Sequence, residues 1–467
     1  MIGLDAEAPT GIPRVQDFLM RAAAAERGVG LVHFDRGFGK FVYLADGERD
    51  RYMNGPRIFA LAGPETGDES GRSGSFSVSS LFNALKIVWD FPDSGRELDR
   101  NVAASLTDQQ KKGLDYTLWK TTFRVLRWGI AALRFRWFRK LRRGRRAIDP
   151  ARTHVLLSHM TVSGSRGITA LTSTRSRSMI LHDLIPVTHP ELTINPRHGP
   201  QAARELTEVL REQPLIHCTS RASEQALKEF VRANKIPMPS IARFTLPSFL
   251  HEKAAAAGRT GRIDPAEPFV FYCSTIEARK NHLLLLRIWA RSIAEGRPLP
   301  RLVLAGKWGW GVEAVHHFWE AHPELRPYVT FTGQIGDDTL IDFYRSARFG
   351  VMPSIIEGWG YGASECLDFA TPVIVSTAPA LIEATHGLMP AIDPGDFDGW
   401  YETVSRLARD DEMLKKLRAK IAEGYSPTAS AESWEKIRGS IERYVQSSAS
   451  GRSGIRKRAG RGARQSA

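Results

Sequence analysis

Short apolar runs alternate with amphipathic stretches through the second half of the chain. The apolar runs lie at 268–276, 301–307, 328–333, 349–354, 372–376 and 388–393. Between them, the stretches 280–296, 337–347 and 360–370 place apolar residues at helical spacing. Short strands that alternate with helices predict a parallel sheet covered on both faces. We therefore expect one α/β domain over about 265–425.

The first half of the chain shows a weaker version of the same pattern. A helix is predicted at 14–28, and strands are predicted at 29–35, 153–159, 178–183 and 214–220. We interpret residues 1–250 as a second α/β domain with an insertion at about 62–150. The stretch 250–268 is predicted to be a linker, 426–446 a C-terminal helix, and 447–467 a disordered basic tail.

The net charge of +14 is concentrated in two segments. Residues 119–146 hold eleven Lys and Arg and no acid, and residues 451–467 hold six, which leaves a balance of 14 − 17 = −3 elsewhere. Within the first segment, apolar residues at steps of three and four form one helical stripe: Trp119, Phe123, Leu126, Ile130, Leu133, Trp137 and Leu141. Such a helix is typical of peripheral binding to an anionic membrane surface. Packing on the protein's own surface and nucleic-acid binding are the alternatives.

Several classes of protein and site find no support in the sequence. No apolar run is long enough to span a bilayer, and the first residues lack the basic start of a signal peptide. The cysteines Cys218, Cys273 and Cys366 show no ligand or redox spacing, which favours a cytoplasmic protein. No G-x-G-x-x-G follows the first strand of either domain, so we expect no dinucleotide cofactor, and we expect no metal site.

Two acids and three glycines lie between two predicted strands of the second domain. Glu357 follows the run 349–354, and Glu365 lies eight positions later in the next helix. Ligands of α/β sheets bind outside the carboxyl ends of the strands, and glycines let a ligand approach the backbone. The alternative is a solvated loop followed by an acid that favours the helix N-terminus.

A pair of cations occupies the equivalent place after the first strand of this domain. Arg279 and Lys280 precede the helix at 280–296. Cations oppose the dipole at a helix N-terminus, so an anionic ligand such as a diphosphate would explain them. A solvated helix start is the alternative.

These motifs together resemble a known family. The run from Phe269 to about Lys416 looks like the donor domain of a GT-B glycosyltransferase of family 4, with Glu357 and Glu365 as its E-x7-E motif and Arg279–Lys280 as its R-K pair. The segments 9–15 and 182–191 resemble the glycine loop and the His-Asp-Leu-Ile-Pro stretch of its mannosyltransferases. The family usually has Gly-Phe-Gly-Leu-Pro where this chain has residues 358–362, Gly-Trp-Gly-Tyr-Gly. Only Met1 to Leu4 precede the glycine loop as a candidate first strand, which leaves open whether the N-terminus is complete.

The resemblance implies two Rossmann-like domains that face a central cleft, and a retaining transfer without a metal. It implies catalytic roles for Glu357 and His182 at the sugar, and for Arg279 and Lys280 at the diphosphate. Glu365 would bind the ribose hydroxyls. Donor-binding backbone is implied at Gly11, Gly358, Trp359, Gly360, Tyr361 and Gly362.

We therefore expect a glycosyltransferase that moves a hexose from a nucleotide-sugar, with mannose from GDP-mannose expected first. The acceptor is expected to be a glycan or a lipid-linked glycan of bacterial surface polysaccharide or lipopolysaccharide synthesis. We expect the protein at the inner face of the cytoplasmic membrane. A UDP-sugar donor is one alternative, and a basic nucleic-acid-binding protein is an alternative from another class.

Overall fold

The computed structural model describes residues 12–26, 28–30, 32–35, 40–43, 118, 120–122, 125–126, 148–149, 153–157 and 176–462. Side chains are described in these ranges except at 12–13, 32–35, 40–43, 198 and 448–462. The chain divides into two compact units, one of residues 1–13, 28–33 and 41–148 and one of residues 14–27, 34–40 and 149–467. The sheets β3–β6 and β7–β12 belong to the second unit, and so do the side-chain contacts described below.

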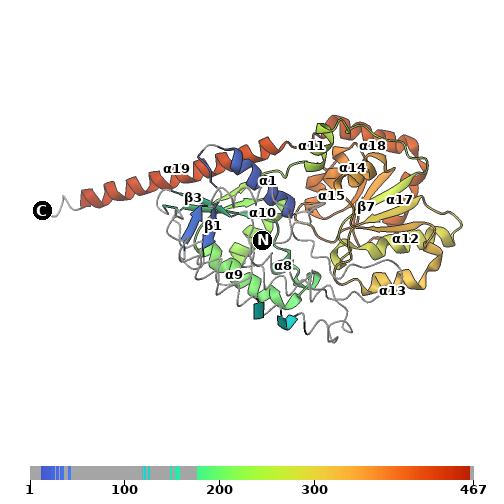
Figure 1. The fold of residues 1–467 in the computed structure, drawn as a ribbon, viewed down its shortest axis with the longest axis horizontal. Helices are drawn as coiled ribbons and strands as arrows, with labels where there is room; N and C mark the ends of the chain where they lie inside the picture. Colours follow the sequence, from blue (N-terminus) through green and yellow to red (C-terminus); the bar gives the residue numbers. More distant parts are fainter. Residues whose placement is uncertain are drawn as a thin grey trace. The chain divides into compact units, whose positions relative to one another are not determined.

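A six-stranded parallel sheet forms the centre of the C-terminal half (Figure 1). Its spatial order is β12 (Ala391–Ile392), β11 (Val373–Ser376), β10 (Phe349–Met352), β7 (Phe269–Cys273), β8 (Arg301–Ala305) and β9 (Val329–Gly333). Each predicted strand of this half is present, and the observed strands lie within the predicted ranges. Chain order and spatial order differ because β7 pairs with both β8 and β10, so a crossover separates β9 from β10.

Helices cover both faces of this sheet. Figure 1 shows α12 and α13 on one side and α14 and α15 on the other. Their bounds, with the remaining helices of this half, are α11 (Phe249–Ala256), η5 (Ala278–Lys280), α12 (His282–Ala294), α13 (Glu313–Ala321), η6 (Pro323–Leu325), α14 (Asp337–Ser346), α15 (Tyr361–Asp368), α16 (Pro379–Ala384), α17 (Phe397–Arg409) and α18 (Asp411–Gly424). The stretch predicted as a linker at 250–268 therefore begins as a helix, and α11 buries Leu250 and Ala254 in the apolar core.

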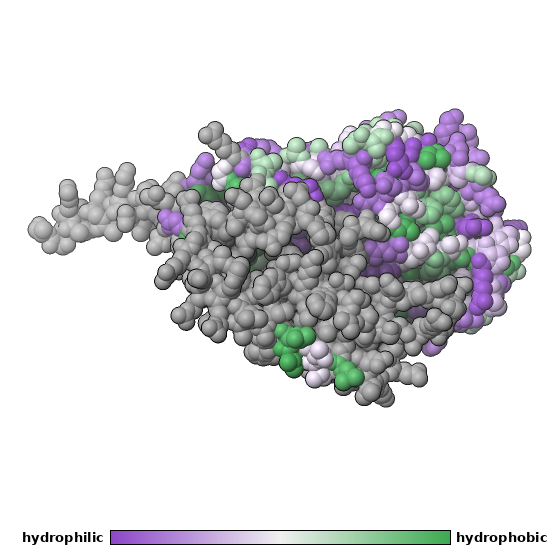
Figure 2. All heavy atoms as spheres, in the orientation of Figure 1, coloured by the Kyte–Doolittle hydropathy of each residue, from purple (hydrophilic) through white to green (hydrophobic). Residues whose placement is uncertain are grey.

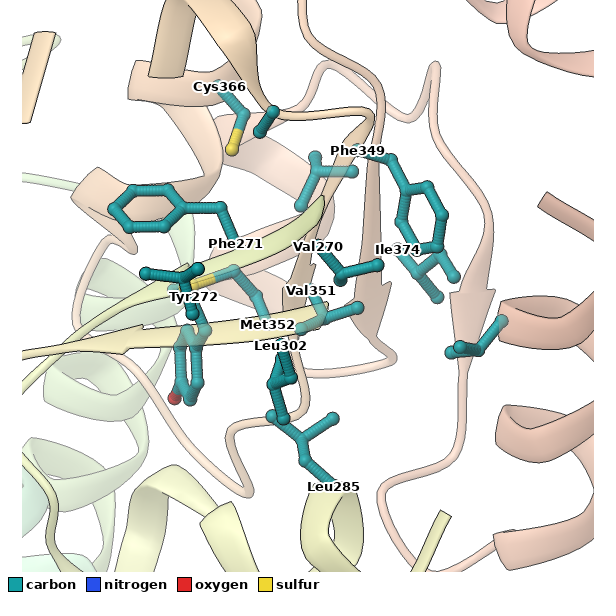
Figure 3. Close-up of a cluster of buried hydrophobic side chains, with 14 of the residues drawn as sticks. Val270, Phe271, Tyr272, Leu285, Leu302, Phe349, Val351, Met352, Cys366 and Ile374 are labelled. Carbon is teal, nitrogen blue, oxygen red and sulfur yellow. The ribbon is translucent and has the colours of Figure 1, made fainter. Parts of the chain in front are cut away.

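The core of this half lies between the sheet and its helices (Figure 3). All four residues of β10 and all four of β11 are buried, which explains why their sequences are continuous apolar runs. A Cβ atom on Gly350 would lie 2.6 Å from the Cys366 sulfur, and one on Gly362 would lie 3.0 Å from the Met352 sulfur. These two glycines therefore allow α15, which carries Glu365, to pack closely on the strands.

The N-terminal half contains a four-stranded parallel sheet. Its order is β3 (His154–Leu157), β4 (Ser176–Leu181), β5 (Leu215–Cys218) and β6 (Ile241–Arg243). A separate pair is formed by β1 (Val32–Asp35) and β2 (Lys40–Tyr43). The helices are α1 (Ile12–Ala25), α8 (Ile185–Thr188), η3 (Pro190–Leu192), η4 (Pro196–His198), α9 (Gly199–Arg211), α10 (Arg221–Ala233) and, at the end of the chain, α19 (Ser430–Gly462). The predicted α/β class is confirmed in both halves, and the predicted domain boundaries stay predictions.

Helix α19 returns from the C-terminal half and packs on β5 and β6. Its Trp434, Ile437 and Ile441 join an apolar cluster with Val15 and Leu19 of α1. The helix continues to Gly462, through most of the segment predicted as a disordered tail. Among the described residues no helix has both the length and the apolar character that spanning a membrane requires. On the face shown in Figure 2, hydrophilic side chains predominate along the outer edge of the C-terminal half.

Candidate functional site

Two loops of the C-terminal half meet because the strands that precede them are neighbours. The short helix η5 follows β7, and the loop 353–360 follows β10. Because β7 and β10 are parallel and hydrogen-bonded, their carboxyl ends lie at one edge of the sheet. Asn281, which ends η5, adopts a left-handed conformation (φ 57°) and donates to the carbonyl oxygens of Pro353 and Pro394. This arrangement places Arg279 and Lys280 directly against Glu357.

Glu357 accepts a charged hydrogen bond on each carboxylate oxygen. Arg279 Nη1 donates to Oε2 at 2.7 Å, and Lys280 Nζ donates to Oε1. Arg279 Nη1 also reaches the carbonyl oxygen of Ile356 at 3.1 Å. Glu357 is 9% exposed, so the cluster is removed from bulk water. The structure therefore brings together three of the four residues predicted to be catalytic.

Glu277 completes this cluster on its other side. Its Oε1 lies 2.7 Å from Arg279 Nε, and its side chain is buried. Arg279 is thereby fixed between Glu277 and Glu357. Glu277 was not among the predicted site residues, because two residues of separation in a loop do not show which side chain a guanidinium will contact. The cluster contains two cations and two carboxylates and is neutral as it stands.

Burial and the two cations act in opposite directions on Glu357. Burial would raise the pKa of its carboxyl, but Lys280 and Arg279 outweigh burial and lower this pKa to about 2. Burial lowers the pKa of Lys280 in spite of Glu357, whereas Glu357 and Glu277 outweigh burial at Arg279 and raise its pKa. Burial raises the pKa of Glu277. Glu357 is therefore an ionised carboxylate, unsuited to donating a proton near neutral pH.

Glu365 lies in a second, separate cluster. Arg14 Nη1 donates to its Oε1 at 3.0 Å, and the Tyr344 hydroxyl donates to its Oε2 at 2.7 Å. Arg14 Nη2 donates to Asp337 Oδ1 at 2.6 Å. Burial raises the pKa of Glu365 even though Arg14 and Tyr344 act to lower it. Arg14, Tyr344 and Asp337 were not among the predicted site residues.

The predicted His182 and its neighbour Asp183 lie beside the glycine segment. A Cβ atom on Gly358 would lie 2.7 Å from the carbonyl oxygen of His182 and 2.9 Å from the Asp183 Cβ. Ser223 donates to this His182 oxygen at 2.7 Å, and Thr219 donates to it at 3.0 Å. Only glycine at 358 permits this approach, which brings the end of β4 to the loop that carries Glu357. Burial raises the pKa of Asp183, and Arg279 opposes the effect.

The aromatic side chains of the glycine segment point into the protein. Trp359 and Tyr361 join the apolar cluster that includes Val15, Phe18 and Phe244. Gly360 adopts φ +106°, and a Cβ atom there would lie 2.3 Å from Leu381 Cδ2. The predicted donor-binding role of residues 358–362 rests on their backbone and stays a prediction. Gly11 lies outside the described residues.

Two further features of the described residues bear on the chemistry. No cluster of three or more His, Cys, Asp or Glu in this part of the chain is arranged to hold a metal ion. Cys218, Cys273 and Cys366 are free thiols. Burial raises the pKa of Cys218 and of Cys273 to about 12 each, so neither is a reactive thiolate at neutral pH.

Comparisons with known proteins address the same part of the chain. Residues 267–410 match the family described as "Glycosyl transferases group 1". The serotype-specific mannosyltransferase WbdA of Escherichia coli is 24% identical over 217 residues, which is 44% of this chain and 26% of that protein. The O-antigen chain mannosyltransferase B of Escherichia coli is 28% identical over 143 residues, which is 31% of this chain and 37% of that protein.

Two further comparisons extend the picture. A D-inositol 3-phosphate glycosyltransferase of Salinispora arenicola is 29% identical over 219 residues, which is 44% of this chain and 48% of that protein. A solved UDP-forming trehalose-phosphate synthase from Burkholderia xenovorans aligns at a TM-score of 0.46 and 12% identity, and covers 62% of this chain and 73% of that one. This chain thus spans from a quarter to a half of the curated relatives named here.

The family match covers the clusters of Glu357 and Glu365, including Arg279, Lys280 and Tyr344, and leaves only Arg14 outside it. The relatives are glycosyltransferases by name, and their similarity to this chain is too low to carry over a sugar or a pathway. Residues 267–410 are therefore a glycosyltransferase domain of the group 1 type.

Proposed function

We propose that the protein is a retaining hexosyltransferase that moves mannose from GDP-mannose to a glycan or lipid-linked acceptor. Bacterial surface polysaccharide or lipopolysaccharide synthesis is the proposed setting. The similarity to two Escherichia coli mannosyltransferases, one of them named for the O-antigen chain, supports this choice. The whole protein's activity is a proposal, because the chain spans only part of those relatives.

The observation that carries the proposal is the pair of cations held by Glu357. Transfer of a sugar from a nucleoside diphosphate builds negative charge on the departing diphosphate. Arg279 and Lys280 are adjacent, partly buried and preorganised by Glu277 and Glu357. Fixed cations in a site of low dielectric stabilise developing charge far more than they would in water.

In the empty site, Glu277 and Glu357 neutralise the two cations. Two partly buried cations without partners would destabilise the folded protein. Glu357 and Glu277 neutralise them until the diphosphate arrives, so nucleotide binding exchanges one set of anionic contacts for another. The same exchange would free the Glu357 carboxylate beside the donor sugar, where His182 is proposed to lie on the acceptor side.

We further propose that transfer requires no metal ion. Arg279 and Lys280 supply the positive charge that a divalent cation supplies to the diphosphate in other transferases. Glu365 is proposed to accept hydrogen bonds from the ribose hydroxyls, and the backbone of Gly358 to Gly362 to bind sugar hydroxyls.

A second candidate keeps the site and changes the donor to a UDP-sugar. Matches to D-inositol 3-phosphate glycosyltransferases at 27–30% identity show that this chain is as similar to them as to the mannosyltransferases, so a donor other than GDP-mannose is kept as a candidate. Thermal unfolding with GDP, UDP, GDP-mannose and UDP-glucose separates the two, since a ligand bound only by the folded state raises its stability by mass action. Protection by GDP and GDP-mannose alone supports the mannosyl proposal, and protection by the uridine pair alone replaces it with the second candidate.

The cation pair is tested by Arg279→Ala and Lys280→Ala. Each should lower kcat for donor hydrolysis or transfer by ~10²-fold or more. Arg291→Ala is the matched control, because Arg291 is a partly exposed cation on α12 that pairs with Glu295 at the surface. Near-normal turnover in both site variants, with the control unchanged, would overturn the diphosphate assignment.

We also propose that the basic insertion attaches the protein peripherally to anionic membranes. Apart from a few helical positions between 118 and 126, this segment lies outside the described residues, so the support is its sequence pattern. Sedimentation with anionic and neutral vesicles at low and high salt tests it, since electrostatic attraction is screened by salt. Deletion of 115–146 should abolish binding, and a deleted protein that still sediments would make the segment after 451 the next candidate.

A further inference from the structure

Arg14 reaches the second glutamate of the donor site from a distant part of the sequence. It lies at the start of α1, 351 positions before Glu365, and its guanidinium bridges two carboxylates from different helices. One is Glu365 of α15, and the other is Asp337, the first residue of α14. The contact thus joins the N-terminal helix to both helices that border this part of the site.

The geometry is that of a buried ion pair rather than a surface one. The side chains of Arg14 and Glu365 are each 7% exposed. Lys253, which is 46% exposed, approaches Asp337 Oδ2 at 3.5 Å, and no ion pair between it and Glu365 is found among the described residues. Removing one partner of a buried pair leaves the other charge uncompensated, which makes Arg14 decisive for the state of Glu365.

Arg14 is held in place by the packing of its own helix. Val15, Phe18 and Leu19 of α1 are buried in the cluster that contains Trp359. Trp359 lies in the glycine segment between Glu357 and Glu365. The helix that carries Arg14 and the loop that leads to Glu365 therefore share one apolar core.

The Glu365 carboxylate has more acceptor sites than Arg14 and Tyr344 occupy. An ionised carboxylate offers about four acceptor sites, two on each oxygen. Arg14 occupies one site on Oε1 and Tyr344 occupies one on Oε2. One acceptor site remains on each oxygen, which matches the two hydroxyls of a ribose.

We propose that Arg14 is a positioning residue for the donor nucleotide, which holds the Glu365 carboxylate in the orientation and charge state that accept the ribose hydroxyls. This inference rests on the proposed role of Glu365 in nucleotide binding. It adds that a residue of the N-terminal half, outside the matched family region, sets donor affinity. Arg14 acts through Glu365 and is not assigned a contact with the reacting atoms.

Calorimetry with GDP and with UDP tests the inference on four variants: Arg14→Gln, Arg14→Lys, Glu365→Gln and the double variant Arg14→Gln/Glu365→Gln. Arg14→Gln should weaken binding of the preferred diphosphate tenfold or more. The affinity of Arg14→Lys should lie between that of Arg14→Gln and that of the natural protein, because a lysine ammonium keeps the positive charge but cannot donate from two nitrogens to two carboxylates as the guanidinium does. Arg21→Gln is the matched control, since Arg21 lies on the same helix and forms an exposed pair with Asp17. Its affinity should stay within twofold.

The double variant separates positioning from general stability. If Arg14 acts through Glu365, Arg14→Gln should have no further effect in the Glu365→Gln background. If Arg14→Gln does not fold, Arg14→Lys with its own double variant gives the same comparison. Unchanged affinity in Arg14→Gln, or an equal loss in both backgrounds, would overturn the inference.

A pH profile gives a second readout. Besides Arg14 and Tyr344, the titratable groups that interact with Glu365 among the described residues are Asp337, Cys273, Cys366, Tyr361, Asp368 and Tyr425. Loss of the Arg14 charge raises the pKa of Glu365, so protonation should weaken nucleotide binding at a higher pH in Arg14→Gln than in the natural protein. An identical profile would count against the inference. If the natural protein binds neither diphosphate, the proposed function is wrong, and this inference, which rests on it, is wrong as well.

Discussion

Asp368 offers a test of the fold whose size can be worked out from its surroundings. It is the last residue of α15, and its Oδ1 accepts hydrogen bonds from Ser248 and Tyr425, each at 2.7 Å. Ser248 also pairs with the backbone of Thr428 in both directions. Asp368 therefore links Ser248, where the chain enters the C-terminal half, to Tyr425, where the chain leaves it. Its other oxygen is buried and has no hydrogen-bond partner among the described residues.

Burial raises the pKa of Asp368 from 3.8 to about 7, although Ser248 and Tyr425 act to lower it. At 1.36 kcal/mol per pKa unit, the shift of roughly three units corresponds to about 4 kcal/mol. Because the folded pKa exceeds the unfolded one, the folded state binds the proton more tightly. This contribution is fully present below the unfolded pKa near 3.8 and is lost as pH rises through the folded pKa near 7.

The perturbation is Asp368→Asn, which keeps the size and the acceptor oxygen and removes the titration. At pH 5 the Asp368 carboxyl is protonated in the folded natural protein, so the two folded proteins carry the same charge at this position. At pH 8 the variant should be more stable, and the difference should grow by roughly 2–3 kcal/mol between the two pH values. Part of this gain is offset because the amide leaves a buried donor without a partner.

Thermal or urea unfolding at both pH values measures the effect. For a domain of roughly 150–250 residues, each kcal/mol of unfolding free energy changes the melting temperature by about 2–4 °C. Asp411→Asn is the matched control, because its carboxylate is 84% exposed and pairs with Arg348 at the surface. If Asp368→Asn and the natural protein lose stability in parallel between pH 5 and pH 8, the argument from burial is wrong.

Three further predictions concern the site. Glu365→Gln should weaken nucleoside diphosphate binding more than it lowers kcat. Glu357→Gln should lower kcat and leave diphosphate affinity unchanged or improved, because it removes the anion that competes for Arg279 and Lys280. Calorimetry and steady-state kinetics measure both effects, and the opposite pattern would show that the two roles are reversed. Gly358→Ala should destabilise the protein by about 1–3 kcal/mol, since its Cβ would lie 2.7 Å from the His182 oxygen, and an unchanged unfolding midpoint would contradict this contact. Exhaustive treatment with EDTA should leave the transfer rate unchanged, and a loss restored by Mg²⁺ or Mn²⁺ would refute the metal-free proposal.

The sequence was most informative where the physical signal is local. The strands β7, β10 and β11 are buried on both faces, so each appears as an uninterrupted apolar run. Helix α11 was missed because it is short and buries only Leu250 and Ala254, too few positions to give a helical period. The alanines at its end and the Gly-, Arg- and Pro-containing stretch that follows resemble a linker in composition.

Contacts between distant residues could be predicted only in part. Arg279, Lys280 and Glu357 follow two strands, but pattern alone does not show that β7 and β10 are neighbours; the family resemblance supplied that step. Arg14 gave no signal, because an arginine on an amphipathic helix ordinarily faces solvent and its partner lies 351 positions away. The predicted role of Trp359 and Tyr361 concerned their backbone, and the sequence did not show that their side chains fill the apolar cluster beside α1.

The two glutamates of one motif are therefore opposite electrostatic cases. Both are buried, and burial alone would raise both pKa values. Glu357 has two cations on its carboxylate and its pKa falls to about 2, whereas Glu365 has one cation, shared with Asp337, and its pKa rises. A permanently ionised Glu357 suits a site that must balance cations before and after a diphosphate leaves. Under the proposed function, a Glu365 whose charge depends on one distant arginine would make donor binding sensitive to how the N-terminal helix is held, and would link the N-terminal half of the protein to the donor nucleotide.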